Sequence, residues 1–354
     1  MYPQTSTPTL LLDETKCREN IANMAEKARR HKLLFRPHFK THQSLEIGAW
    51  FREEGVKSIT VSSLSMASYF AEQWIDITVA FPVNILEIDT INRLASCIRL
   101  GLLVESLESL HHLQNKLDHK VAIWIKIDVG YHRTGVRPDD HNRINALMQS
   151  AKSHPMTQFK GFLGHAGHSY QCQGKEEVLK IHQESLAVMQ VLKSKYPESL
   201  ISVGDTPTCS VAEDFEGVDE IRPGNFVFYD LMQYHIGSCT HEQIAVSMAC
   251  PIVAIHTERQ ELVIHGGAVH FSKDRHPDGS FGWVIDRNGK PISGMKLSKI
   301  SQEHGTISVP HEMTQNYNIG DIICILPVHS CLTANLHSEY KKLEGDFWIK
   351  RFRL

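Results

Sequence analysis

The stretch LFRPHFKTHQ, residues 34–43, places a single lysine, Lys40, just behind a short apolar run. Arg36, His38 and His42 are its basic or titratable neighbours in the sequence. Nearby cations and partial burial both lower the pKa of an amine, and such an amine attacks an aldehyde more readily. We therefore predict that Lys40 is a Schiff-base residue, with an ordinary surface lysine as the alternative.

The apolar run before Lys40 is also the first of eight short runs that alternate with helical patterns. In one helical pattern, Ile88, Ile91 and Leu94 recur at the spacing that lines one face of a helix. The fold class is therefore α/β, and eight strand–helix alternations predict a (β/α)8 TIM barrel, with an open doubly wound sheet as the alternative. The predicted strands are 33–37, 58–62, 76–81, 102–105, 121–129, 159–165, 200–204 and 219–226.

The pattern changes after Tyr234, where strand-like runs such as IAVSMACPIVAI and GDIICILPVHSCL are separated by Gly, Pro, Asn and Asp turns. This change predicts an antiparallel β domain at residues 237–354, behind a barrel at residues 13–236. A short leading strand within residues 1–12 is expected to join the β domain.

Composition and charge limit the partners. The formal charge of -3 over 354 residues gives no broad basic field, so we expect no nucleic-acid partner. No stretch approaches the roughly 18 unbroken apolar residues of a membrane helix, and no basic segment followed by an apolar one stands at the start, so we expect no membrane partner and a cytoplasmic location. The eight cysteines include no CxxC pair, which is not the pattern of a disulfide framework. Small molecules are the expected partners.

Polar motifs follow the later predicted strands, namely HAGHSY at 165–170, GDTPT at 204–208 and RPGNFVFYD at 222–230. In a barrel, reactive groups gather at the C-terminal ends of the strands, where Lys40 also lies. GDTPT and RPGN offer glycines, hydroxyls and backbone N–H groups of the kind that hold phosphate, although GDTP is also an ordinary turn. Their positions on the seventh and eighth strands, where barrels often bind phosphate, favour a phosphate site.

Three further side chains lie near these strand ends. Arg133 follows the fifth strand in DVGYHRTGV, where a solvated or ion-paired arginine is the alternative to a ligand-binding one. Tyr170 and Tyr229 are placed to stack on a planar ligand or to hydrogen-bond with it, or they are ordinary half-buried tyrosines.

In the β domain, PVHSCLT places His329 and Cys331 two residues apart. On an extended strand, residues i and i+2 point to the same side, so an imidazole nitrogen and a thiolate sulfur would share one metal. Both are good zinc donors, and two protein ligands leave positions open for water or substrate, as a catalytic site requires. The HxC pattern alone is common, and it then has no metal.

Taken together, these segments resemble the fold-type III pyridoxal-phosphate (PLP) enzymes, and among them the D-serine dehydratase and D-threonine aldolase group. The resemblance covers nearly the whole chain in order: TPTLLLD, RPHFKTH, DVGYHRTGV, HAGHSY, GDTPT, RPGNFVFYD and VHSC. It implies a PLP-holding, alanine racemase-like barrel followed by a β domain, in a homodimer whose active site is often shared between subunits.

The resemblance also implies a role for each matching residue. Lys40 would form the Schiff base with PLP and remove the α-proton of the substrate, and His329 and Cys331 would hold Zn²⁺ or another divalent metal. Arg133 would lie near the phenolic oxygen of the cofactor, and Arg222 would face its pyridine nitrogen. The remaining cofactor contacts would be Tyr170, Gly204, Thr206, Thr208, Gly224, Asn225 and Tyr229.

The implied function is a PLP- and zinc-dependent lyase, a dehydratase or ammonia-lyase of the carbon-nitrogen class. It would act on a D-3-hydroxyamino acid such as D-serine and give a 2-oxo acid and ammonia. The same residues support a carbon-carbon lyase, a D-threonine or 3-hydroxy-D-aspartate aldolase, although the aldolases more often show His-x-Asp at the metal pair. A racemase without a metal would leave HxC unused. A non-catalytic PLP carrier is the alternative from another class, and it would not need the β domain.

One segment departs from the D-serine dehydratase pattern. HGGAVHFSKDR, residues 265–275, stands where those enzymes have a different glycine-containing loop. Its side chains His270, Lys273, Asp274 and Arg275 would recognise a substrate other than serine, for example one with a second carboxylate.

Overall fold

The computed structural model describes residues 5–311, 313–345 and 347–352. The chain forms two compact units, one of residues 22–224 and the other of the residues up to 21 together with those from 225 onward. The first unit contains a parallel sheet and the second a mainly antiparallel one.

The division between the units falls between Gly224 and Asn225, whereas the sequence placed it after residue 236. The segment between these positions groups with the β domain because it is hydrogen-bonded there. Met232 N donates to Val328 O at 3.2 Å, and Ala245 N donates to Phe228 O at 2.8 Å. Composition changes only after these residues, which is why the sequence pattern placed the boundary later.

The first unit contains eight parallel strands, hydrogen-bonded in the order β2-β9-β8-β7-β6-β5-β4-β3. The two ends of this order also meet, because Phe39 N donates to Thr60 O and Thr60 N donates to Pro37 O, each at 2.9 Å. The sheet therefore closes on itself, which confirms the (β/α)8 barrel and excludes the open sheet. The strands are β2 (Leu34–Phe35), β3 (Ile59–Val61), β4 (Asp76–Pro82), β5 (Arg99–Val104), β6 (Val121–Lys126), β7 (Thr157–Leu163), β8 (Leu200–Val203) and β9 (Glu220–Ile221).

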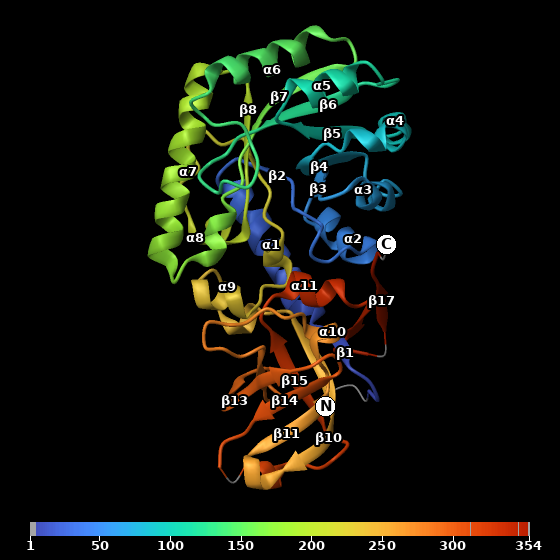
Figure 1. Cartoon of the computed structure of the whole chain (residues 1–354), viewed down its shortest axis with the longest axis vertical. Helices are drawn as coiled ribbons and strands as arrows, with labels where there is room; N and C mark the ends of the chain where they lie inside the picture. Colours follow the sequence, from blue (N-terminus) through green and yellow to red (C-terminus); the bar gives the residue numbers. More distant parts are fainter. Residues whose placement is uncertain (1–4, 312, 346, 353–354) are drawn as a thin grey trace. The chain divides into compact units, whose positions relative to one another are not determined.

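Helices separate the barrel strands, and α6 and α7 run along the outside of β6, β7 and β8 (Figure 1). Three helices begin at a serine whose hydroxyl accepts a backbone N–H, at Ser44, Ser63 and Ser106, and this cap fixes where each helix starts. The helices are α1 (Glu14–Arg30), which the unit boundary divides, α2 (Leu45–Glu53), α3 (Leu64–Phe70), α4 (Ile88–Ala95), α5 (Leu107–Gln114), α6 (His141–Ser153), α7 (Lys175–Lys195) and α8 (Thr206–Val211), with the 3-10 turns η1 (Ile85–Glu87) and η2 (Gly167–Gln171).

The β domain is built on six strands in the order β11-β14-β13-β12-β15-β10, and the pairing of β10 with β11 closes them into a small barrel. Strand β1 (Thr9–Leu12) pairs antiparallel with β10, so the leading strand lies in this sheet. β1 also pairs parallel with β16, so the domain is not purely antiparallel. The other strands are β10 (Val246–His256), β11 (Glu261–His265), β12 (Gly282–Ile285), β13 (Pro291–Ile300), β14 (His304–Ser308), β15 (Ile322–Pro327), β16 (Glu339–Lys342) and β17 (Trp348–Lys350).

Short helices complete this unit. Helix α9 begins at Asp230, whose carboxylate accepts from Gln233 N. The helices are α9 (Leu231–Ile236), α10 (Ala268–Phe271) and α11 (Ser330–Asn335), with the 3-10 turns η3 (Asn225–Val227), η4 (His241–Gln243), η5 (Thr257–Arg259) and η6 (Thr314–Asn316). Two of them, α10 and α11, pack against each other and follow strands β11 and β15 (Figure 1).

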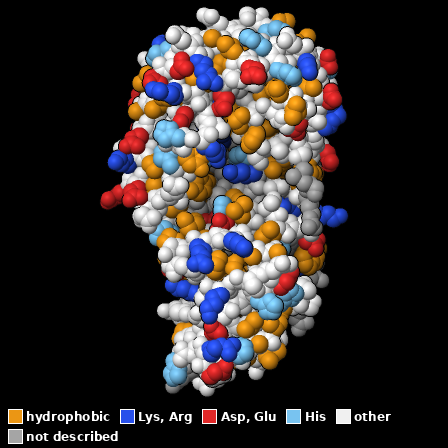
Figure 2. Space-filling model, in the orientation of Figure 1, with side chains coloured by type: hydrophobic (Ala, Val, Ile, Leu, Met, Phe, Trp, Pro, Cys, Tyr) orange, Lys and Arg blue, Asp and Glu red, His pale blue; other side chains and the backbone are white. Residues whose placement is uncertain are grey.

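The surface carries both signs of charge. Figure 2 shows basic and acidic side chains interspersed over the visible face, in agreement with the small net charge. Among the described residues, no helix combines the length and the apolar character that a membrane crossing requires. All eight cysteines are free thiols.

Candidate active site

A cavity of about 310 Å³ lies at the C-terminal ends of the barrel strands. Its walls bring together side chains and glycines that follow six different strands. The residues predicted from sequence that line it are Lys40, Arg133, Tyr170, Gly204, Arg222 and Gly224. Leu103 and Leu163, which form a buried apolar cluster with Trp124, give the cavity an apolar wall. Segments that are far apart in the sequence therefore meet at one place, as the barrel predicts.

Lys40 reaches this cavity from a turn that is firmly packed. The neighbouring Phe39 is fully buried, with its ring centroid 4.9 Å from that of Phe51 and 5.0 Å from that of Phe70. Gln43 donates its side-chain amide to the carbonyl of Lys40 at 2.9 Å. The backbone that carries the amine is thus fixed, while the side chain itself is exposed to the cavity.

Two of the three neighbours expected to surround the amine of Lys40 do not line the cavity. Arg36 is buried and ion-paired with two carboxylates. Its Nε lies 2.6 Å from Glu220, and its Nη1 contacts Asp76. His42 is buried and stacks on Phe51. Only His38 lines the cavity with Lys40. Sequence adjacency failed here because the chain turns directly after β2, so successive side chains point to different surroundings.

The cations that do line the cavity come from distant strands. Lys126 ends β6 and is buried, and its Nζ donates to the carbonyl of Ile127 at 2.8 Å. Among the described residues, no carboxylate lies within 4.0 Å of this amine. Burial, together with the charge of Arg222, lowers the pKa of Lys126 to about 7. Lys126 was not among the residues predicted from sequence, although a lysine closing the apolar strand VAIWIK at the same end as Lys40 was a usable signal.

Arg222 is held rigidly at the opposite side of the same cavity. Its Nε donates to Ser202 Oγ and its Nη2 donates to the Gly164 carbonyl, each at 2.6 Å. Ser202 in turn donates to Glu220, the carboxylate that also binds Arg36. Burial lowers the pKa of Arg222 to about 10, so the side chain stays charged at neutral pH.

Two histidines complete the polar lining. Burial and the charges of Lys40 and Arg222 lower the pKa of His38. Burial also lowers the pKa of His165, whose Nδ1–H donates to the Gly204 carbonyl at 2.6 Å. Both rings are therefore neutral at neutral pH, and the other ionisable groups of the lining are its lysines, its arginines, Asp205 and Tyr170.

The glycine-rich segments predicted to hold phosphate approach each other closely. A Cβ on Gly204 would lie 2.7 Å from the backbone of Arg222, and one on Gly224 would lie 2.9 Å from the carbonyl of His38, so only glycine fits at either position. Gly224 N donates to Thr206 Oγ1 at 3.3 Å. Both the amide and the hydroxyl of Thr208 donate to Asp205, each at 2.8 Å, so the donors of Thr208 are already occupied.

Asn225 and Tyr229, also predicted for the cofactor, belong to the β-domain unit and do not line the cavity. Tyr229 is buried, and its N–H donates to the Asn225 carbonyl at 2.8 Å. The side-chain amide of Asn225 donates to Asp230 at 2.7 Å, to Ser330 Oγ at 3.0 Å and to Cys331 Sγ at 3.4 Å. Asn225 thus contacts the predicted metal pair within its own unit.

His329 and Cys331 are neighbours, but not on one strand as predicted. Strand β15 ends at Pro327, His329 is the extended residue before α11, and Cys331 lies in the first turn of that helix. Burial opposes a charge on His329, but Cys331, Asp230 and Asp274 outweigh it and raise the pKa of His329 to about 9. Asp274 lies 3.6 Å from His329 Nδ1.

The buried carboxylate of Asp230 fixes the start of α11. It accepts from Ser330 N at 3.0 Å and from Ser330 Oγ at 3.3 Å, and Ser330 stands between the two predicted metal ligands. Asp230 had no predicted role, although it is the last residue of the RPGNFVFYD motif. Of the predicted loop cations, Lys273 is exposed, and Arg275 lies over the ring of Phe281 at 4.8 Å.

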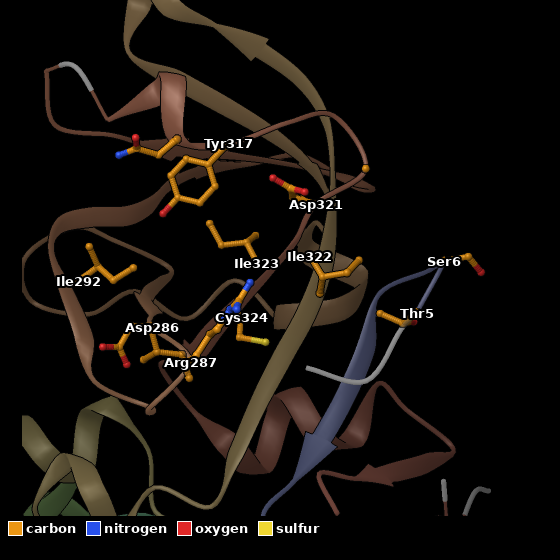
Figure 3. Close-up of a pocket in the computed structure, with 13 residues that line it drawn as sticks. Thr5, Ser6, Asp286, Arg287, Ile292, Tyr317, Asp321, Ile322, Ile323 and Cys324 are labelled. Carbon is orange, nitrogen blue, oxygen red and sulfur yellow. The ribbon is translucent and has the colours of Figure 1, made fainter. Parts of the chain in front are cut away.

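Size alone does not identify the site. Figure 3 shows a larger hollow in the β domain, of about 810 Å³, where Ile322 and Ile323 lie near Tyr317, Asp321 and Arg287. None of the residues predicted to bind cofactor or metal lines it.

Known proteins are similar to this chain over nearly its whole length. A family model described as "Alanine racemase, N-terminal domain" matches residues 12–231, and one described as "Putative serine dehydratase domain" matches residues 245–342. D-serine dehydratase of Dictyostelium discoideum is 32% identical to this chain, over 96% of the chain and 94% of the relative. The chain belongs to the D-serine dehydratase family. The predicted resemblance is confirmed, and as a member of the D-serine dehydratase family the chain is a PLP-dependent lyase.

Other members of the D-serine dehydratase family and solved structures extend the likeness. D-threo-3-hydroxyaspartate dehydratase of Delftia sp. (strain HT23) is 28% identical over 96% of this chain and 94% of the relative. Its structure matches with a TM-score of 0.92 over 98% of both chains, at 27% identity. A D-threonine aldolase from Filomicrobium marinum matches with a TM-score of 0.86 at 18% identity, which shows the shared fold.

Proposed function

We propose that this protein is a PLP- and zinc-dependent dehydratase of a D-3-hydroxyamino acid, D-serine or a 3-hydroxyaspartate, that releases a 2-oxo acid and ammonia. One observation carries the proposal: an amine, two arginines and two closely packed glycines from separate strands converge on one cavity in a D-serine dehydratase family member. Relatives that are dehydratases by name match 96% of this chain.

The cavity fits PLP by the chemistry of its donors. Lys40 supplies an amine for the aldehyde, the glycine backbones of 204 and 224 leave room for a phosphate to approach N–H groups, and the neighbouring cations match an anionic ligand. When bound, PLP accepts the electron pair left at Cα after proton loss. Lys40 would bind the cofactor and then, once the substrate amine has replaced it, take the proton from Cα.

The cations that line the cavity would hold the anionic groups of cofactor and substrate. Arg222 is rigid because Ser202 and Gly164 fix two edges of its guanidinium, so it would orient whatever it faces. Arg133 lies over the ring of Tyr131 at 4.9 Å, which fixes its direction. Lys126 would add a positive charge when an anion binds, because an anion favours the protonated amine.

His329 and Cys331 would hold zinc, since imidazole nitrogen and thiolate sulfur are its preferred donors. Zinc supplies Lewis acidity that helps a hydroxyl group leave. Asp230 and Asn225 would orient the pair by fixing Ser330 and Cys331. The thiolate, where the aldolases more often have a carboxylate, favours dehydration over carbon–carbon cleavage.

We also propose a homodimer. The side chain of Phe81 lines the barrel cavity and is 59% exposed, and Leu86 in η1 is 87% exposed. Exposed large apolar side chains beside a cavity are suited to burial by a second subunit. Light scattering on the purified protein tests the dimer. We expect twice the mass of one chain, and the mass of a single chain would contradict the proposal.

Product analysis tests the reaction. Purified protein with PLP and zinc is incubated with D-serine, D-threonine or D-threo-3-hydroxyaspartate. A 2-oxo acid with ammonia, in equal amounts, supports the dehydratase. Glycine with an aldehyde or oxo acid would contradict it and assign the aldolase reaction instead, and no product from any of the three would favour a PLP carrier.

A further inference from the structure

Three side chains with metal-binding atoms cluster in the β domain, away from the His329–Cys331 pair in sequence. They are His265 at the end of β11, His270 in α10, and Glu303 in the turn between β13 and β14. One ligand atom from each lies within 4.8 Å of the others. We propose that His265, His270 and Glu303 form a second divalent-cation site, of the zinc class. This proposal does not depend on the reaction proposed above.

The distances leave the space that an ion needs. Nε2 of His265 and Nε2 of His270 each lie 3.8 Å from the same carboxylate oxygen of Glu303, too far for a hydrogen bond. With zinc–ligand distances of about 2.0–2.1 Å, two ligand atoms of a tetrahedral site lie roughly 3.3–3.4 Å apart. Each imidazole–carboxylate distance therefore has to shorten by only a few tenths of an ångström to reach that value, and the ligand atoms of all three residues lie within 4.8 Å of one another.

The backbone around the cluster is already held in place. Gly266 N donates to the Glu303 carbonyl and Ala268 N donates to the Ser301 carbonyl, each at 2.8 Å. A Cβ on Gly267 would lie 2.4 Å from the carbonyl of Gln302, so the glycine allows this close approach. The segments that carry the three ligands are thus joined before any ion binds, which reduces the ordering that binding requires.

The charges also suit a cation. Within the described part of the chain, no lysine or arginine lies within 4.0 Å of the Glu303 carboxylate, so its charge is available. Partial burial lowers the pKa of His270, which leaves the ring neutral as a ligand must be. Two imidazoles with one carboxylate are a common ligand set for zinc with an open position.

One hydrogen bond opposes binding. Gly267 N donates to Nδ1 of His270 at 3.2 Å, so the neutral ring carries its proton on Nε2. Coordination through Nε2 moves that proton to Nδ1 and breaks this bond. The site is therefore weaker than one whose histidine tautomer is already set.

An ion here would stabilise the segment that leads to Asp274. The carbonyl of His270 accepts from His337 Nε2 at 3.0 Å, and that of Phe271 accepts from Thr333 Oγ1 at 2.9 Å, so α10 is tied to α11 and the residues after it (Figure 1). We expect a structural role, in which the cation fixes α10 against the β13–β14 turn.

A zinc titration tests the site. The protein is stripped of metal and then titrated with Zn²⁺ in competition with a chromophoric chelator. The variant Cys331→Ala removes a donor of the other pair, and we expect it to retain one bound ion. Adding Glu303→Gln should weaken that ion at least tenfold, while adding His304→Ala, next to the cluster, should leave it unchanged. Equal affinity in Cys331→Ala with and without Glu303→Gln overturns the proposal.

Thermal stability gives a second readout and separates the two metal proposals. Zn²⁺ should raise the melting temperature of Cys331→Ala but not that of Cys331→Ala with Glu303→Gln, and both variants should melt alike without metal. The unmodified protein could instead bind a single ion that Glu303→Gln abolishes and Cys331→Ala retains. That result would support the cluster of His265, His270 and Glu303 and would remove the proposed metal role of the His329–Cys331 pair.

Discussion

The side-chain amide of Asn225 donates to Sγ of Cys331 at 3.4 Å, and the same nitrogen lies 2.7 Å from the carboxylate of Asp230. Asn225 follows the RPG motif, which the sequence assigned to the phosphate of a cofactor. Its contacts instead connect it to the thiol of the proposed metal pair. The buried Asp230 completes this connection by accepting from Ser330, the residue between His329 and Cys331.

This network predicts that Asp230→Asn weakens zinc binding at the His329–Cys331 pair. The carboxylate accepts from Ser330 and Asn225 through one oxygen and from Gln233 N through the other, whereas the amide has only one accepting oxygen. One of these contacts is therefore lost, and the pair loses its fixed direction. Loss of such an outer partner typically costs 10–100-fold in metal affinity. Competition with a chelator measures the change, and Asn84→Ala, which removes the cap of η1 in the barrel unit, is the control. Equal affinity in Asp230→Asn and the control would show that the network has no role.

The buried amine of Lys126 predicts a pH-dependent stability. Burial lowers its pKa from 10.5 to about 7, so between these values the unfolded chain binds a proton that the folded chain does not. The free energy of unfolding contributed by this group therefore rises with pH from about 7 to about 10 and is lowest below 7. The gain in unfolding free energy of Lys126→Met over the native protein should be larger at pH 6 than at pH 9, by up to a few kcal/mol.

Urea unfolding at both pH values measures this difference. Lys120→Met is the matched control, because Lys120 is exposed and stands just before the same strand. Parallel stability curves for Lys126→Met and the native protein would contradict the burial of a titrating amine.

Arg36 is predicted to serve stability and not catalysis. It neutralises the buried Glu220, which also accepts from Ser202 beneath Arg222. Arg36→Met leaves that carboxylate without its cation, and breaking a buried pair in this way typically costs about 3–5 kcal/mol. Denaturant unfolding should show the loss, whereas Arg137→Met, which breaks an exposed pair with Asp139, should change little. An equal effect of both changes would disprove the role of Arg36.

Metal removal should stop turnover. We expect exhaustive chelation to lower the rate on a D-3-hydroxyamino acid by more than tenfold, and added zinc to restore it, because the hydroxyl is a poor leaving group without a Lewis acid. Binding of PLP, followed by its absorbance, should survive chelation. Full turnover after chelation would be incompatible with the proposed role of His329 and Cys331.

The sequence was sufficient for the eight barrel strands because each is a short apolar run that ends at a turn or a polar motif. It was also sufficient for the convergence of Lys40, Arg133 and Arg222, since residues that follow parallel strands share one end of a barrel. The order of the segments identified the family, and most of these motifs follow the end of a strand.

The sequence was insufficient where a side chain depends on a distant partner. Asn225 contacts Ser330 and Cys331, more than a hundred positions away, and no local pattern reveals that choice. Arg36 looks like a neighbour of Lys40 until Glu220 and Asp76 are seen to bind it. Lys126 was missed because residues 121–129 were predicted as one continuous strand, whereas the strand ends at Lys126, where the lysine faces the same end of the barrel as Lys40.

Reduction of the PLP-loaded protein with borohydride, followed by peptide mass mapping, tests the central claim most directly. We predict that the reduced cofactor is attached to Lys40 alone, and that Lys40→Ala carries no label, while Lys120→Met is labelled as the native protein is. A label on Lys126 or on any other lysine, with Lys40 unmodified, would contradict the assignment on which the proposed reaction rests.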